Sequence, residues 1–161
     1  MKTTFEEAKE RVHNEEVKLL QGLLEKNYDA ENGFKKALEH TENLDLKEYL
    51  KYQAAIRNRF ATELDYIIRS LDETPVESGS STGSLHRTWI DVKAKISGKT
   101  DDAILEECIR GDKASVKEYK DAFEEFSFPP EIQRALSKQL EEVEVTLETI
   151  KTIEDLKDKE W

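Results

Sequence analysis

Four acidic residues of the chain could supply oxygen ligands to a divalent metal ion. They are Glu31, Glu63, Glu106 and Asp112, and three of them interrupt stripes of apolar residues at helical spacing. Carboxylate oxygens suit iron and manganese, and metal sites in helical bundles are built from side chains that project inward. A buried carboxylate is costly unless it is paired or bound to a metal. One hypothesis is therefore a carboxylate-bridged site for iron or manganese, with these acids as ligands.

The inward-facing polar residues also permit a purely structural interpretation. Arg57 lies level with Glu31 when residues are counted from the predicted hairpin turn, so it can neutralise that carboxylate. Gln53 and Gln139 can hydrogen-bond to each other or to Tyr119, and buried polar groups of this kind fix the register of helices. Counted from the predicted hairpin turns, the inward-facing acids do not lie at one level along the helices. A third alternative is a pocket for a small ligand, whose lining the sequence does not define.

A histidine and a cysteine could also be reactive. His86 titrates near neutral pH and follows a segment rich in glycine and serine, so it could be a ligand or a general acid–base. In the alternative, Ser84 caps a short helix, Trp89 packs that helix onto the bundle, and the histidine is structural. Cys108 shares an apolar stripe with Leu105, which predicts a buried thiol that is not a nucleophile.

The chain lacks the sequence signatures of the common enzyme classes. It has no Ser-His-Asp order, no glycine-rich phosphate loop and no dinucleotide fingerprint. We therefore expect a protein that is not an enzyme and needs no cofactor. Iron or manganese is expected only under the metal-site hypothesis.

The composition restricts the partners and the location of the protein. With 36 acidic and 25 basic residues, its formal net charge of -11 repels nucleic acids. The N-terminus lacks an apolar export signal, and no window approaches the ~20 apolar residues that cross a bilayer. The single cysteine excludes an internal disulfide and fits a reducing compartment. We expect a cytoplasmic protein that binds neither nucleic acid nor membrane.

Long helices of one domain must position these side chains, because 161 residues can form a single core. Apolar residues recur at intervals of three and four, as at Leu20, Leu24, Phe34 and Leu38. The pattern predicts an N-terminal extension over residues 1–14 and one domain over residues 15–157. The predicted helices cover approximately residues 15–42, 45–71, 84–97, 100–126 and 129–157.

Local signals mark the ends of these helices and their connections. Asp45 and Glu48 have the spacing of a capping box, and Pro129 and Pro130 fit the first turn of a helix. Residues 77–84 are mostly small and polar, which predicts that they form part of a long connection. The sequence therefore predicts an all-α, ferritin-like up-down four-helix bundle, whose long crossover between the second and third long helices carries a short extra helix.

Several short segments resemble known proteins. The most specific is Leu85–Lys93, with the sequence LHRTWIDVK. The others are Asn32–Phe34, Ile104–Glu107, Gly111–Asp112 and Ile150–Lys151. Together these segments resemble a bacterial ferritin-like four-helix-bundle family of unknown function, over about residues 15–157. The resemblance implies the bundle with helices paired as above, and for function it implies only a ferritin-like relationship.

The di-iron motif of ferritin-like proteins is missing. Their metals are held by a glutamate on each of two helices and a Glu-x-x-His pair on each of the other two. This chain contains no Glu-x-x-His, and its histidines are His13, His40 and His86, none of them at a position where the motif belongs. We expect a non-enzymatic binding or stress-associated protein. The alternative is a divergent carboxylate-bridged protein that binds two iron or two manganese ions.

The protein partner is not identified by the sequence. A homodimer formed through an apolar helix face is one expectation. Another class of function is an interaction module that folds around a helix of a second protein, which would expose an apolar strip beyond what the bundle buries.

Overall fold

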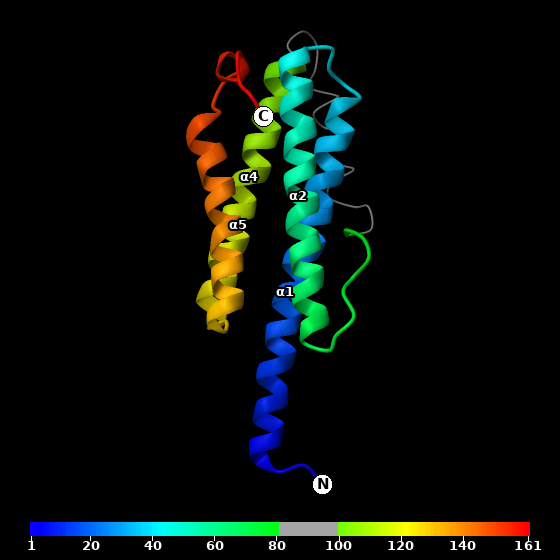
Figure 1. The fold of residues 1–161 in the computed structure, drawn as a ribbon, viewed down its shortest axis with the longest axis vertical. Coiled ribbons are helices and arrows are strands. Elements are labelled where there is room, and N and C mark those ends of the chain that lie inside the picture. The colour runs from blue at the N-terminus through cyan, green and yellow to red at the C-terminus, as the bar shows by residue number, and fades with distance from the viewer. Residues whose placement is uncertain (81–99) are drawn as a thin grey trace.

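Long α-helices make up most of the described chain. A computed structural model describes residues 1–80 and 100–161. The elements are α1 (Thr4–Leu38), α2 (Leu44–Ser70), α4 (Thr100–Glu125), α5 (Pro130–Thr149) and the short 3₁₀ helix η1 (Ile153–Leu156). These two stretches contain no strand, so the all-α prediction is confirmed for them (Figure 1). The predicted helix over residues 84–97 and His86 lie outside the described residues.

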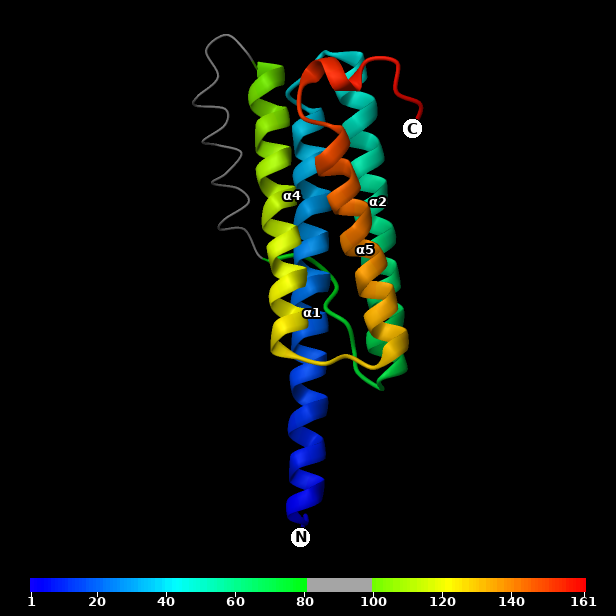
Figure 2. The ribbon, with the colours of Figure 1, turned by 90° about the vertical axis from the view of Figure 1, so that its left-hand side faces the viewer.

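The four long helices pack as two antiparallel pairs. α1 pairs with α2, and α4 pairs with α5 (Figures 1 and 2). α2 finishes at the end of the bundle where α5 starts, whereas α4 starts at the opposite end, so α2 and α4 run in the same direction (Figure 2). α1 also lies against α4. We call this contact between the two helix pairs the seam.

α1 begins at Thr4 rather than at residue 15, so the predicted N-terminal extension is largely helical. Thr3 caps the helix, because its hydroxyl accepts a hydrogen bond from the Glu6 amide and the Glu6 carboxylate accepts one from the Thr3 amide. The first turns of α1 extend beyond the bundle as a single helix (Figures 1 and 2). None of the described helices lies beside these turns to bury an apolar face, and Phe5 is 77% exposed. Apolar periodicity therefore could not reveal this part of the helix.

The turn between α1 and α2 differs from the predicted one. It covers residues 39–43, and Asn43 is the N-cap of α2, since its side-chain oxygen accepts a hydrogen bond from the Leu46 amide at 2.9 Å. The predicted capping box of Asp45 and Glu48 is wrong, because both residues lie inside α2. The earlier start follows from packing: it places Leu46 in the core, where it is completely buried.

α5 is shorter than predicted and does not reach residue 157. Ile150 leaves the helix with an extended backbone, φ -113° and ψ 106°. Thr152 and Asp155 then form a capping box that starts η1. The break allows Ile150 and Leu156 to be buried together in one cluster. In a continuous helix, Leu156 would instead lie about 120° around the helix axis from Ile150.

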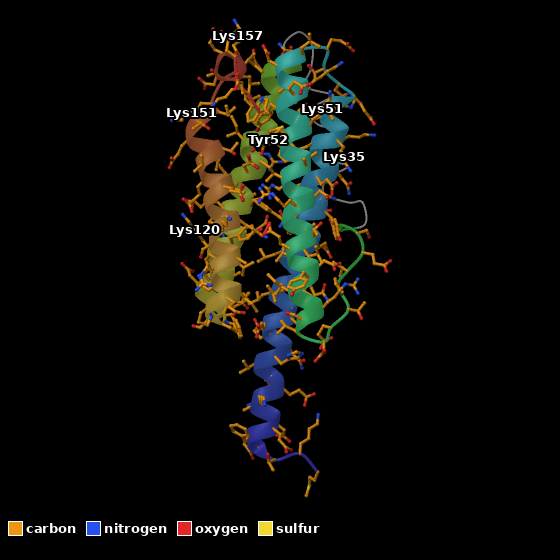
Figure 3. The ribbon with its side chains drawn as sticks, in the orientation of Figure 1. Lys35, Lys51, Tyr52, Lys120, Lys151 and Lys157 are labelled. Carbon is orange, nitrogen blue, oxygen red and sulfur yellow. The ribbon has the colours of Figure 1, made fainter. Side chains whose placement is uncertain are left out.

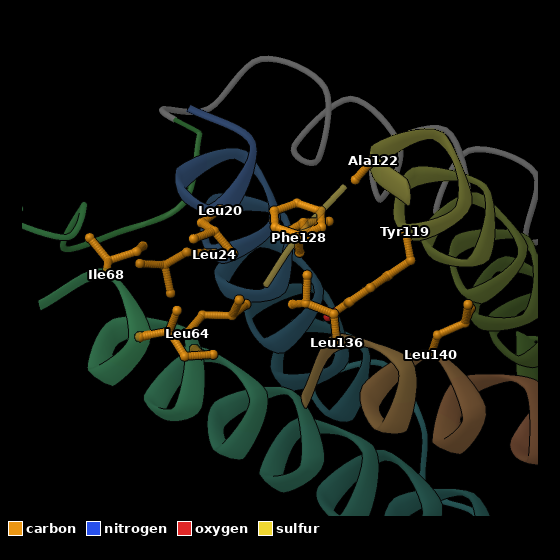
Figure 4. Packing of buried hydrophobic residues seen from close by; sticks show 12 residues of the cluster. Leu20, Leu24, Leu64, Ile68, Tyr119, Ala122, Phe128, Leu136 and Leu140 are labelled. Carbon is orange, nitrogen blue, oxygen red and sulfur yellow. The ribbon is translucent and has the colours of Figure 1, made fainter. Parts of the chain in front are cut away.

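Two clusters of apolar side chains form the core, one toward each end of the bundle. The cluster near the α1–α2 turn includes Phe34, Leu46, Leu50, Ile104, Leu105 and Leu156. The cluster at the other end includes Leu20, Leu24, Leu64, Ile68, Tyr119 and Leu136, which converge between the helices in Figure 4. On α1, α2 and α4, buried polar residues lie between the two clusters. A polar layer therefore crosses the middle of the bundle.

Charged side chains cover the outside of the bundle. Lys35, Lys51 and Lys120 point away from its axis, and their side chains are mostly exposed (Figure 3). This arrangement accounts for a charged fraction of 38% in a chain that still buries two apolar clusters. No helix in residues 1–80 and 100–161 combines the length and apolar character needed to cross a membrane.

Candidate functional site

The polar layer is centred on Arg57 of α2, which is 2% exposed. One terminal nitrogen of its guanidinium donates to Asp112 Oδ1 at 2.8 Å and to Ser115 Oγ at 3.0 Å, both on α4. The other donates to Asn27 Oδ1 of α1 at 3.0 Å. Arginine suits this position because its planar guanidinium can hold several acceptors in fixed directions. Arg57 therefore links three helices.

A second set of hydrogen bonds extends the layer to α5. The Asn27 amide donates to the Tyr119 hydroxyl at 3.0 Å, and this hydroxyl donates to Gln139 Oε1 at 2.6 Å. Gln139 donates in turn to the backbone oxygen of Phe60 at 3.4 Å. All four long helices thus contribute to one connected network of buried hydrogen bonds.

The predicted partners of these residues are partly correct. The predicted hydrogen bond between Gln139 and Tyr119 is confirmed. The predicted pairing of Arg57 with Glu31 is wrong, since the carboxylate beside Arg57 is that of Asp112. Glu31 instead lies 2.7 Å from the amine of Lys35, one turn along the same helix, and accepts hydrogen bonds from Asn58.

Gln53 does not join the network. Its amide nitrogen is buried, and no described residue accepts a hydrogen bond from it. The prediction that it pairs with Gln139 or Tyr119 is therefore wrong: those two residues bind each other, Tyr119 also binds Asn27, and Gln139 binds the backbone oxygen of Phe60.

A cavity of about 250 Å³ opens between α1 and α4 and reaches this layer. Its floor consists of buried side chains, namely Phe34, Arg57, Cys108, Asp112 and Ser115. Exposed residues form its mouth, including Lys26, Arg110, Gly111 and Ala114. Within the described residues, the cavity that contains the buried ion pair is therefore bordered by exposed side chains at the seam between α1 and α4.

Small residues create the hollow. Ala30 and Gly33 on α1 and Gly111 and Ala114 on α4 line the cavity. On each helix they are three residues apart and so lie on adjoining turns. A Cβ atom added to Gly111 would meet no atom within 4 Å. Larger side chains at these positions would fill the seam, as in an ordinary helix–helix contact.

The floor of the cavity offers polar atoms that the described residues leave without partners. Asp112 accepts a hydrogen bond only at Oδ1, so its second oxygen receives none from the described part of the chain. The hydroxyl of Ser115 accepts from Arg57 and donates to none of the described residues. An ionised carboxylate has room for about four hydrogen bonds, and a hydroxyl can donate one. The floor can therefore both accept from and donate to a bound molecule.

Burial controls the protonation of the groups in the cavity. It raises the pKa of Asp112 above its usual value, while the Arg57 guanidinium acts in the opposite direction. Burial also raises the pKa of Glu118 on the wall, against the influence of Lys26 and Arg57. The pKa of the Cys108 thiol is raised well above its usual range by burial and the nearby Asp112. The prediction of a buried cysteine is confirmed, and its thiol stays protonated at neutral pH.

The four candidate metal ligands occupy separate surroundings. Asp112 is paired with Arg57 in the core, and Glu31 lies beside Lys35. Glu63 is partly exposed near Arg59, and Glu106 is exposed on α4. Within residues 1–80 and 100–161, no three histidine, cysteine, aspartate or glutamate side chains are grouped so that they could hold a metal ion.

The sequence analysis identified Asp112 and Cys108 but missed the cavity that they line. Ser115 and Glu118 were not singled out, because a serine and a glutamate on a long charged helix are unremarkable by type. The available signal was the coincidence of small residues on two helices, Ala30 and Gly33 with Gly111 and Ala114. That signal becomes informative only when α1 is known to pack against α4 rather than against α2 alone.

Comparison with known proteins gives the family but no function. A family described as a domain of unknown function (DUF2383) matches residues 15–125, which cover α2, α4 and most of α1. The matched stretch contains every residue that lines the cavity. No curated protein matches the chain. Because the match covers more than half of the sequence, the chain belongs to the DUF2383 family of domains of unknown function.

Proposed function

We propose that the protein is a non-enzymatic binding protein that holds a small polar molecule in the cavity between α1 and α4. The observation that carries this proposal is the position of the Arg57–Asp112 pair: it is buried, yet it forms the floor of a cavity whose rim, within the described residues, consists of exposed side chains. Binding sites of bundles typically lie between helices and combine apolar walls with a few fixed polar groups.

Energetics favours binding over a purely structural role for this arrangement. A buried ion pair contributes little net stability compared with well-packed apolar residues. The register of the helices could be fixed by the Asn27–Tyr119–Gln139 hydrogen bonds alone. A ligand would complete the hydrogen bonding of Asp112 and Ser115. The cavity has the volume of about eight water molecules, which suits a compact metabolite.

The groups in the cavity support binding rather than covalent catalysis. Burial keeps the thiol of Cys108 protonated, and a thiol is a much weaker nucleophile than a thiolate. The hydroxyl of Ser115 lies beside Arg57, which is a cation and cannot act as its general base. Among the described residues, neither potential nucleophile of the cavity is activated.

The proposal includes the ferritin-like arrangement and the bacterial cytoplasm expected from the sequence. The two antiparallel pairs and the common direction of α2 and α4 support that arrangement (Figure 2). The single cysteine, buried and protonated, supports a reducing compartment. A role in the stress response is part of the same proposal and rests on the sequence resemblance.

The test is a binding screen that compares an open cavity with a filled one. A library of small polar metabolites is screened by ligand-observed NMR against the wild type and Gly111→Leu, whose side chain would enter the cavity. Gly22→Leu is the matched control, because Gly22 is also an exposed helical glycine with open space around it but lies outside the cavity.

We expect compounds that bind the wild type and Gly22→Leu but not Gly111→Leu. If every compound that binds does so equally to all three proteins, or if none binds the wild type, the cavity is not a binding site and the proposed function fails.

A further inference from the structure

We propose that the ligand of this cavity is a small organic cation, an aliphatic amine or guanidine that carries two positive groups. This inference rests on the proposed function and specifies its substrate class. The charges that line the cavity, and the carboxylate oxygens that lack donors, select a cation over an anion or an uncharged molecule.

Acidic groups outnumber basic groups around the cavity. The lining contains four acids, Asp29, Glu107, Asp112 and Glu118, and three bases, Lys26, Arg57 and Arg110. Two of the bases are already paired within the lining, Arg57 with Asp112 and Arg110 with Glu107. The charged lining residues outside these two ion pairs are the acids Asp29 and Glu118 and the base Lys26. The unpaired part of the lining is therefore acidic, and its field favours a positive ligand.

The floor offers an acceptor where one end of the cation would bind. Asp112 is 2% exposed, and its second oxygen receives no hydrogen bond from the described residues. An ammonium or guanidinium group has N–H donors and no acceptor, so it matches this oxygen in both charge and hydrogen bonding. An anionic ligand would instead place like charges beside a carboxylate in a poorly hydrated site.

The wall offers a second acidic position nearer the mouth. Glu118 is half-buried and accepts no hydrogen bond from the described residues. Burial raises its pKa, against the influence of Lys26 and Arg57. It lies six residues from Asp112 on α4, about 9 Å along the helix. Two cationic groups joined by a short aliphatic chain can approach both carboxylates.

Apolar side chains also line the cavity. Ala30, Phe34 and Ala114 line the cavity together with Cys108. Methylene groups of an alkyl diamine or of an aminoalkyl guanidine would be removed from water against these side chains, at about 0.8 kcal/mol per buried methylene. The lining therefore fits an aliphatic chain with charged ends better than a compact, fully polar ion such as ammonium.

The experiment measures binding of putrescine and agmatine to the full chain by isothermal titration calorimetry. Succinate and 1,4-butanediol are the anionic and uncharged probes of similar length. All titrations are made at about 0.15 M salt, so that loose attraction to the acidic surface is screened. We expect a saturable one-to-one complex with putrescine or agmatine, and at least a tenfold weaker one with the other two probes.

Three variants connect the binding to the cavity. Glu118→Gln should weaken cation binding about tenfold, and Gly111→Leu should abolish it. Glu63→Gln is the matched control, because Glu63 is a partly exposed acid on α2 outside the cavity, and its substitution should leave affinity unchanged.

The two proposals fail in different ways. Binding of succinate or butanediol at the Gly111-dependent site, without binding of either cation, overturns the inference about the ligand but supports the proposed function. If Glu118→Gln and Glu63→Gln weaken cation binding equally, the binding reflects the surface charge, and the inference is also overturned. Absence of any Gly111-dependent ligand in the metabolite screen overturns both.

Discussion

A guanidinium nitrogen of Arg57 lies 2.8 Å from a carboxylate oxygen of Asp112, and both side chains are 2% exposed. Arg57 belongs to the α1–α2 pair and Asp112 to the α4–α5 pair, so this contact joins the two halves of the bundle. Arg57 also binds Asn27 of its own half. The contact thus links the two pairs of helices beside the cavity, in addition to the hydrogen bond between Asn27 and Tyr119.

Removal of either partner of this pair should be strongly destabilising. Arg57→Met or Asp112→Leu leaves a buried charge without its partner, and we expect each to lower the free energy of unfolding by about 3–5 kcal/mol. The double variant removes both charges, so its loss should be smaller than the sum of the single losses by about 2 kcal/mol. Urea unfolding of the four proteins gives this coupling. Strictly additive losses would contradict the direct interaction.

Tyr119 should make the protein sensitive to alkaline pH. Burial raises its pKa from 10.0 to about 12 in the folded protein. The unfolded chain therefore ionises first, and this contribution to stability is complete below about pH 10 and is lost as the pH rises toward 12. The slope from one such group is at most about 1.4 kcal/mol per pH unit.

Tyr119→Phe should therefore flatten the fall in unfolding free energy above pH 10, measured by urea denaturation at a series of pH values. At neutral pH the variant should be less stable by about 1–3 kcal/mol, because Gln139 and Asn27 each lose a partner. The control is Tyr66→Phe, since Tyr66 is 75% exposed and should change neither quantity. Equal alkaline slopes for the wild type and Tyr119→Phe would argue against the buried hydroxyl.

Alanine at Gly111 should stabilise the protein. A glycine inside a helix costs about 0.5–1 kcal/mol relative to alanine, and the added methyl group would meet no atom within 4 Å. Gly22→Ala in α1 is the matched substitution and should give a similar gain. Thermal and urea unfolding measure both. A destabilised Gly111→Ala would mean that the seam between α1 and α4 is closed in solution.

Deletion of residues 1–11 should leave the bundle intact. These residues lie beyond the body of the bundle, and the first described hydrogen bond from α1 to a distant residue joins His13 to Glu73, at 2.9 Å. We expect the free energy of unfolding to fall by less than about 1 kcal/mol, because little apolar surface is uncovered. Circular dichroism and urea unfolding check this. A loss of several kcal/mol would show that the projecting turns pack against something in solution.

Metal analysis tests the carboxylate alternative. The protein is purified without chelators, its metal content is measured, and Fe(II), Mn(II) and Zn(II) are titrated into the wild type and Glu31→Ala. If the cavity binds an organic molecule and the acids stay dispersed, no metal should bind in stoichiometric amounts at micromolar concentration. Stoichiometric metal that is lost in Glu31→Ala, or consumption of oxygen with Fe(II), would favour the di-metal alternative instead.

The apolar periodicity of the sequence was enough to predict four long helices, because each helix inside the bundle buries one stripe. It failed at both ends of the chain for identifiable reasons. The first turns of α1 have no stripe to bury, and Thr3 and Glu6 supply the stabilising signal instead. At the other end, Ile150 continues the helical pattern but leaves the helix, and the turn that follows brings Leu156 into the same buried cluster.

The polar layer was predicted in composition but not in its pairing. Asn27, Arg57, Asp112 and Gln139 could be recognised as polar residues on apolar stripes. The partner of Arg57 depends on the shift between α2 and α4, which residue counting within one hairpin cannot supply. The cavity depends on the same shift, since it brings the small residues of α4 opposite those of α1.

The projecting start of α1 makes the N-terminus a rigid attachment point. α1 is one continuous helix of 35 residues, about 52 Å long, whose later turns are fixed in the core. A fluorophore or a fused domain placed at its tip would be held at a set distance and orientation by this strut, as by a helical spacer. The rotational diffusion of such a fluorophore would then report on the tumbling of the entire bundle rather than on the motion of a flexible tail.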